Sequence, residues 1–142
     1  MPAKSSTFDN QLLLLIFNGT AITGLAQNNA SPITNLYLSL HTASPGVGGN
    51  QTTNEAAYTG YARVALARSS SNWTVTGASV SPNATVNFPA ATGGSETETY
   101  MAVGTASTGT GEILYFGAIS PTIAVANGVT PQLTTSTVIT ES

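Results

Sequence analysis

The sequence predicts a mainly β protein, a jelly-roll-like β-sandwich of about eight strands with one N-terminal helix. Short runs alternate apolar and polar residues, and Gly, Pro and Asn turns separate them at regular spacing. Hydrophobic residues make up 41% of the chain and charged residues only 6%, which indicates a folded protein with a neutral surface. A chain of 142 residues suits one ordinary domain, so we expect residues 1–142 to form a single β-sandwich domain.

The chain is expected to open with a flexible arm, residues 1–5, and a helix over about residues 7–18. Ser6 would cap this helix, with Asp9 completing a capping box, and Gly19 would end it in a left-handed conformation. The apolar face of the helix is predicted from helical spacing to consist of Phe8, Leu12, Leu15 and Ile16. The apolar run 11–17 is far shorter than the roughly 20 residues that span a bilayer, and no export signal is apparent. We therefore expect no membrane partner.

The run "TNLYLSLHT" has the period of two that is typical of a half-buried strand. It would place Leu36, Leu38 and Leu40 on an inner face and Tyr37, Ser39 and His41 on an outer one. A turn-rich loop, residues 43–54, follows, and "NEAAY" is read as one helical turn capped by Asn54. Further strands are predicted in "YARVALAR", "WTVTG", "ATVNF", "TETYMAVGT", "EILYFGAIS", "PTIAVANGVTPQL" and "LTTSTVITE", with "ASTGTG" as a hairpin loop and Asn127-Gly128 as a turn.

Several classes of partner and site are excluded by composition. The net charge is −3 and only three residues are basic, so the chain cannot neutralise a row of phosphates, and we expect no nucleic-acid binding. There is no cysteine, one histidine and no acidic cluster, so we expect no disulfide, no metal site and no cofactor. A surface so poor in charge is instead typical of a protein covered by other subunits.

Two groups of residues are candidates for catalysis: His41 with its neighbouring hydroxyls, and the pair Glu96 and Glu98. His41 has hydroxyls nearby in sequence, but no nucleophile elbow is present, so we expect a structural or interfacial histidine on the outer face of its strand. Glu96 and Glu98 share one face of a strand, and a pair of carboxylates is the catalytic apparatus of glycosidases. Such a pair is more often a solvated strand edge, which is the interpretation that we favour. Both readings predict a protein that is not an enzyme and has no catalytic residues.

The remaining charged and aromatic residues are read as anchors. Arg63 and Arg68 fall on opposite faces of one strand because their spacing is odd, and each is expected to pair with a glutamate at an interface. Trp73 and the five tyrosines are expected to be core or interface anchors.

Three stretches resemble a family of small tailed-phage virion proteins, the capsid decoration or cement proteins, which are often labelled phage structural or tail-fiber proteins. They are "LYLSLHTASPGVGGNQTTNEAAYTGYARVALAR", "NATVNFPAATGG" and "GTGEILYFGAISPTIAVANGVTPQL". The resemblance implies a viral structural protein that is made in the bacterial host cytoplasm and binds the exterior of an icosahedral phage head. It would cement neighbouring major capsid subunits against the pressure of internal DNA. No catalytic motif carries over.

The resemblance also implies partners. These are the major capsid protein and further copies of the chain in a symmetric homo-oligomer, with a trimer favoured and a dimer second. The stretch from Leu38 to Ser69, with its Gly- and Asn-rich loop, would be a contact element for the capsid or another subunit. Its candidate interface residues are Tyr58, Tyr61, Arg63, His41 and Asn50.

Two alternatives stay open at this stage. One is a tail-fiber or baseplate-associated module that binds a receptor or carbohydrate, with Trp73 as the residue to test. The other is a small glycan hydrolase that uses Glu96 and Glu98, against which the lack of a convincing acid–base pair argues.

Overall fold

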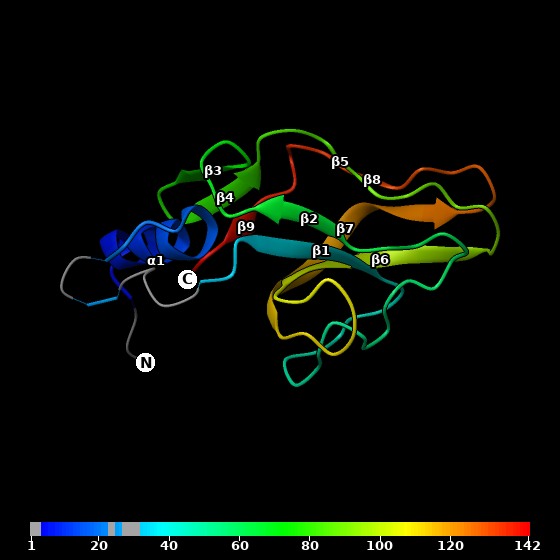
Figure 1. Cartoon of the computed structure of the whole chain (residues 1–142), viewed down its shortest axis with the longest axis horizontal. Helices are drawn as coiled ribbons and strands as arrows, with labels where there is room; N and C mark the ends of the chain where they lie inside the picture. Colours follow the sequence, from blue (N-terminus) through cyan, green and yellow to red (C-terminus); the bar gives the residue numbers. More distant parts are fainter. Residues whose placement is uncertain (1–3, 23–24, 27–31) are drawn as a thin grey trace. The chain divides into compact units, whose positions relative to one another are not determined.

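The computed structural model, which describes residues 4–22, 25–26 and 32–142, is mainly β with one N-terminal helix (Figure 1). This confirms the predicted fold class, with nine strands in the described chain where about eight were expected. The strands form antiparallel sheets of four, three and two strands. The chain groups into two compact units, the first made of residues 1–34, 67–85 and 134–142 and the second of residues 35–66 and 86–133. The assignment of a single domain stays a prediction.

The first unit joins the helix to the three-stranded sheet. Its elements are α1 (Ser6–Asn18), β3 (Trp73–Thr76), β4 (Ser79–Pro82) and β9 (Ile139–Thr140), with strand order β3-β4-β9. The helix begins one residue earlier than predicted, because Ser5 is the cap and its hydroxyl accepts a hydrogen bond from the Phe8 amide. Gly19 ends the helix in the left-handed conformation, with φ of 67°, as predicted.

The buried face of α1 differs from the predicted one. Leu13 and Phe17, about one helical turn apart, are the buried apolar residues. The Phe17 ring packs edge-on against Trp73, with ring centroids 4.8 Å apart. The predicted face, Phe8, Leu12, Leu15 and Ile16, is only half-buried. The apolar run covers every side of the helix here, so its periodicity did not decide which stripe faces the sheet.

Arg68 binds backbone carbonyls. Its guanidinium donates to the carbonyls of Leu15 and Ile16 at 2.8 and 2.7 Å and to that of Ile33 at 2.7 Å. Carbonyls in the last turn of a helix lack partners inside the helix, and a cation there also interacts favourably with the helix dipole. Arg68 thus supports the end of α1, a role that the expected pairing with a glutamate did not include.

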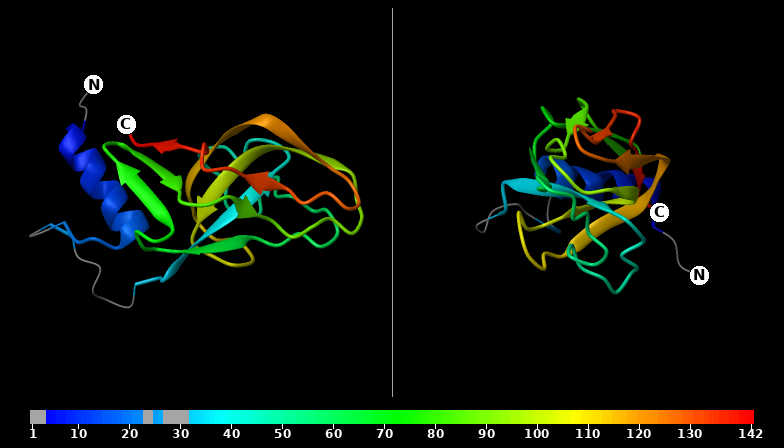
Figure 2. Two further views of the ribbon diagram at one scale, coloured as in Figure 1. Left: turned by 90° about the horizontal axis from the view of Figure 1, so that it is seen from above. Right: turned by 90° about the vertical axis from the view of Figure 1, so that its right-hand side faces the viewer.

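The second unit contains the four-stranded sheet and the two-stranded sheet (Figures 1 and 2). The four-stranded sheet has the order β2-β1-β6-β7, and β5 pairs with β8. The bounds are β1 (Asn35–His41), β2 (Val64–Ala67), β5 (Val86–Asn87), β6 (Glu96–Gly104), β7 (Ile113–Val125) and β8 (Gln132–Leu133). The predicted hairpin loop connects β6 and β7, and Gly128 sits in the predicted turn with φ of 88°.

Strand β1 is buried on both faces. Its three leucines lie in the core as predicted, but Ser39 and His41 are fully buried too, which corrects the expectation of an exposed outer face. The segment after the loop extends alongside the end of β1: Ala56 donates to the Leu40 carbonyl at 2.8 Å and Thr42 to the Asn54 carbonyl at 2.9 Å. "NEAAY" is therefore extended backbone and not a helical turn, and Asn54 has φ of 54°.

We predict that Phe17→Ala lowers the free energy of unfolding by about 3–5 kcal/mol, because it empties a buried site against Trp73. The matched control, Leu15→Ala, lies on the half-buried side of the same helix and is expected to cost clearly less. Urea denaturation of both variants measures the difference. Equal losses would contradict the observed orientation of the helix.

Candidate functional site

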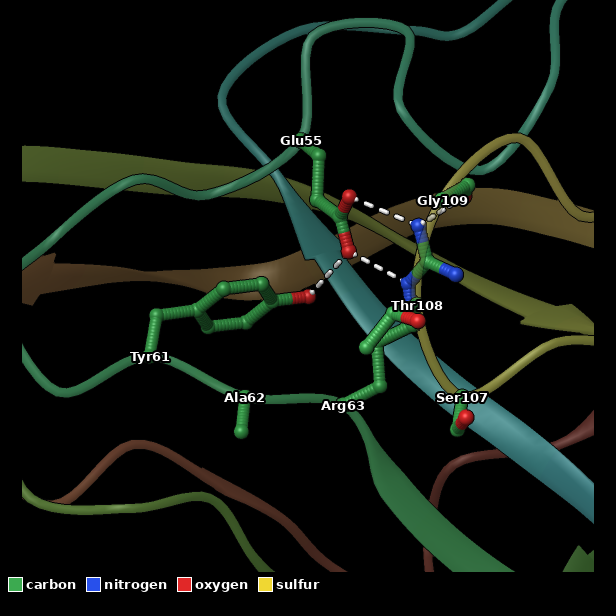
Figure 3. Close-up of a pocket in the computed structure, with 7 residues that line it drawn as sticks. All are labelled: Glu55, Tyr61, Ala62, Arg63, Ser107, Thr108 and Gly109. Atoms are coloured by element: carbon green, nitrogen blue, oxygen red, sulfur yellow. Dashed lines mark hydrogen bonds and ion pairs between the residues drawn. The ribbon is translucent and has the colours of Figure 1, made fainter.

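Two loops of the second unit, residues 42–63 and 105–112, are held together and are called the loop platform from here on. At its centre, Arg63 donates two parallel hydrogen bonds to the Glu55 carboxylate, from Nε to Oε1 at 2.6 Å and from Nη2 to Oε2 at 2.8 Å (Figure 3). The Tyr61 hydroxyl donates to Glu55 Oε1 at 2.9 Å. This bidentate geometry is the strong form of an arginine–carboxylate pair, and only 3% of the Arg63 side chain is exposed.

Arg63 also fastens one loop to the other. Its Nη1 donates to the Ala106 carbonyl at 2.9 Å and its Nη2 to the Gly109 carbonyl at 2.7 Å. The hydrogen bonding of Arg63 to the Glu55 carboxylate is the main reason that the pKa of Arg63 lies above its ordinary value. Arg63 therefore does pair with a glutamate, as expected, but within its own chain and as a tie between two loops.

Gln51 makes the second tie, which the sequence reading missed. Its buried side-chain carbonyl accepts from the Ala106 amide at 2.9 Å, and its backbone N–H donates to the Gly111 carbonyl at 2.9 Å. A Cβ atom on Gly104 or Gly111 would collide with the Gln51 side chain. The two glycines in "GTASTGTG" thus leave the space that the amide fills, and this spacing is the only signal that the sequence carried.

His41 and Ser39 have the local geometry of a base and a nucleophile. His41 Nδ1 lies 2.8 Å from the Thr53 carbonyl, which can only accept, so Nδ1 carries the hydrogen and Nε2 faces the Ser39 hydroxyl at 2.9 Å. Burial lowers the pKa of His41, which favours the neutral ring. Both side chains are fully buried, so they hold Thr53 and the loop on β1 and present no reactive group to solvent.

The outer part of the first loop is ordered by short polar contacts. Asn50 Oδ1 accepts from the Thr52 amide at 2.9 Å and from its hydroxyl at 2.7 Å, and Asn54 donates to the Ser44 carbonyl at 2.9 Å. At the tip, Val47 is fully exposed. Gly46, with φ of 71°, makes the bend beside it. The loop therefore presents an apolar side chain on a tied backbone.

Beside the Arg63–Glu55 pair, the platform carries a shallow depression of about 240 Å³ (Figure 3). It is lined by Glu55, Tyr61, Ala62, Arg63, Ser107, Thr108 and Gly109. The two charges in its wall bind each other, and the loop 105–112 adds hydroxyls and glycine. The depression thus offers a neutral contact surface, without a free acid–base pair for chemistry.

Tyr58 and Glu96 hold the segment that follows the first loop. The Tyr58 hydroxyl donates to the Pro89 carbonyl at 2.9 Å, its ring packs edge-on against Tyr61, and burial raises the pKa of Tyr58 to about 12. Glu96 Oε1 accepts from the amides of Ala57 and Tyr58 at 2.8 and 2.9 Å. These bonds attach the segment that follows the first loop to the sheet.

The expectation of a solvated Glu96–Glu98 strand edge is wrong for Glu98, which is fully buried. Burial raises the pKa of Glu98 to about 8, and hydrogen bonding to Glu96 and the repulsion of its charge add to the shift. The alternation of "ETETY" could not reveal this, because it does not show which segments pack over that face of the strand.

The predicted interface residues are thus found mostly inside the chain. His41 and Tyr58 are buried, Tyr61 and Asn50 are half-buried, and Arg63 is tied down. Their contact role with a partner stays a prediction. Trp73 is also buried, which removes the exposed aromatic platform that the carbohydrate-binding alternative required.

Over residues 4–22, 25–26 and 32–142, no three His, Asp or Glu side chains are grouped so that they could hold a metal ion. Within those ranges, no helix has the length and apolar character needed to cross a membrane.

Comparison with known proteins gives one family. The sequence model described as "Podophage GP4 fiber I protein gp80" matches residues 3–141, almost the whole chain. No curated protein matches significantly.

We predict that Glu98→Gln removes a pH dependence of stability. Between the ordinary pKa of 4.5 and about 8, the unfolded chain releases a proton that the folded chain keeps, so stability falls as pH rises through this window. The slope is at most about 1.4 kcal/mol per pH unit. Glutamine cannot ionise, so its unfolding free energy should be flatter from pH 5 to 8, as measured by urea denaturation. Glu112→Gln, at an exposed position, is the control. Parallel pH profiles for wild type and Glu98→Gln would refute the assignment.

We predict that Gly104→Ala costs about 1–3 kcal/mol, because its methyl group meets the Gln51 amide. In a Gln51→Ala background the same change should cost much less, giving a coupling energy of about 0.5–3 kcal/mol in a double-mutant cycle. Gly48→Ala, where an added Cβ also meets open space, is the matched control. Additive losses at positions 51 and 104 would show that Gln51 is not the group that Gly104 accommodates.

Proposed function

The chain belongs to the podophage GP4 fiber I protein gp80 family and is a phage structural protein, and from this premise we propose that it is a non-enzymatic, fiber-associated virion subunit that contacts its partner through the loop platform. The observation that carries the proposal is Val47, fully exposed at the tip of a loop whose base is tied by Arg63 and Gln51. A contact made by an ordered loop loses little conformational entropy on binding.

The platform has one exposed charged residue, Glu112, and no free charge lines the depression, which supports a contact role over a catalytic one. Arg63 and Glu55 form an ion pair with each other. The side chains of Ser39, His41 and Glu98 are buried in the described structure. A neutral surface with an apolar tip matches a partner surface of similar character, since uncharged groups need no compensating charge when water is removed.

The place of the protein on the virion has two candidate answers. The family description favours a fiber-associated position. The low charge and the resemblance to decoration proteins favour copies on the outer capsid surface that cement neighbouring major capsid subunits, where buried area at each seam would favour the intact shell. In either place the protein would act as a symmetric homo-oligomer, a trimer or a dimer.

Copy number separates these positions. We expect a purified virion to contain a small number of copies, set by the number of fibers, when the chain is quantified by mass spectrometry against the major capsid protein. A ratio near one copy per capsid subunit, or a simple fraction of it, would reject the fiber position and establish the decoration role.

We predict that Val47→Ser reduces incorporation into virions about tenfold or more, without changing the melting temperature. Burying a valine contributes about 1.5–3 kcal/mol, and 1.4 kcal/mol is a factor of ten in affinity. The measurement is competition between tagged wild type and variant during phage assembly, read as the ratio retained on purified particles. Val138→Ser, an exposed valine of the first unit, is the matched control. Equal retention of Val47→Ser and wild type would overturn the role of the loop tip.

A further inference from the structure

We propose that the outer edge of β7 is the surface through which two copies of this chain pair, antiparallel and about a two-fold axis at Gly117. This rests on the proposed homo-oligomer and assigns to it a surface and a register. It does not involve the loop platform, which remains available for the other partner.

The position of β7 in the sheet is the first observation. In the order β2-β1-β6-β7 it is the outermost strand, so its backbone pairs with β6 on one side and with no strand of the described residues on the other (Figures 1 and 2). The row of N–H and C=O groups on such an edge is a template for pairing with another chain.

The sequence of the edge is the second observation. Residues 113–119 read "ILYFGAI", seven residues with strong β-propensity, no charge and no proline. Natural sheets normally protect an edge of this kind with lysines or other charges, because it associates readily. The same absence of charge selects a second copy as the partner. Self-pairing about a two-fold axis would bring like charges of two identical edges close together, and residues 113–119 carry none.

Gly117 is the third observation and fixes the register. It lies inside the strand opposite Met101, where a glycine weakens pairing unless another backbone approaches closely. A Cβ built on Gly117 meets nothing within 4 Å, so no described side chain packs over this position of the sheet face. With the axis at Gly117, the two glycines face each other. Phe116 of each copy then lies opposite the small, exposed Ala118 of its partner.

The length of the pairing is limited by the strand itself. The register with β6 passes from Tyr100↔Ala118 to Glu98↔Ile123, so β7 carries extra residues in a bulge there. Pro121 within this bulge has no N–H to donate. The bulge ends the ladder after residue 119, and the two-fold axis at Gly117 then restricts the pairing to residues 115–119 of each copy.

The chain contains no cysteine, so a single introduced cysteine reports its own neighbour. In the proposed register the Cα atoms of residue 117 in the two copies are about 4.5–5.5 Å apart, within the range that a disulfide spans. We expect Gly117→Cys to form a covalent dimer under mild oxidation, at low protein concentration and in most of the sample. The control, Ala65→Cys, lies exposed on β2 at the opposite edge of the sheet and should stay uncrosslinked.

A second variant keeps the test valid if the cysteine disturbs folding. Ala118→Lys adds a charge at an exposed position without filling buried space, and it should convert the oligomer to monomer in light scattering while circular dichroism stays unchanged. Ala65→Lys is its control. A full-length wild-type chain that is monomeric at micromolar concentration would overturn both this pairing and the proposed homo-oligomer. An oligomer that survives Ala118→Lys and is not crosslinked through residue 117 would overturn the β7 surface alone.

Discussion

The bidentate pair between Glu55 and Arg63 is the interaction on which the loop platform depends. Glu55 belongs to the segment that extends β1, and Arg63 precedes β2, so the pair closes the first loop on itself. The same guanidinium holds the carbonyls of the β6–β7 hairpin loop. Removing either partner of a pair with so little solvent access leaves an uncompensated charge, which typically costs about 3–5 kcal/mol. The ion pair and the hydrogen bonds of Arg63 at the base of the loop therefore order its exposed tip.

This arrangement explains how a chain with so few charges uses them. Arg63 fastens two loops, Arg68 supports the end of α1, and Glu96 holds the backbone beside Tyr58. Charged side chains that usually keep surfaces apart are thus used as internal ties. Apart from Glu112, the exposed part of the platform carries small and uncharged side chains and one valine, a surface suited to contact with another virion component. The phage structural identity and the physical character of this surface are consistent with each other.

The sequence predicted the strands and turns that depend on local pattern. It did not predict which side chains are buried by segments that are distant in the sequence. The alternation around Leu36 and Leu38 predicted β1, and Gly19 and the β6–β7 loop were read correctly, because turn and strand preferences act over a few residues. Ser39, His41 and Glu98 were expected outside and are buried, because segments distant in sequence lie over them. Gln51 was missed for the same reason: its partners are Ala106 and Gly111, more than fifty residues away. Tyr61 and Arg63 were predicted as interface residues, and that role stays a prediction; the structure shows them bonded to Glu55 within the chain.

The central claim, that the loop platform meets another virion component at its tip, is tested most directly by hydrogen exchange. The exchange of the backbone amides of residues 44–50 is compared between the purified chain and intact virions, with the β3–β4 turn of the first unit as an internal reference. The account predicts slower exchange of residues 44–50 in the virion, with the reference turn unchanged. Equal exchange of this tip in the free and the assembled protein would contradict it.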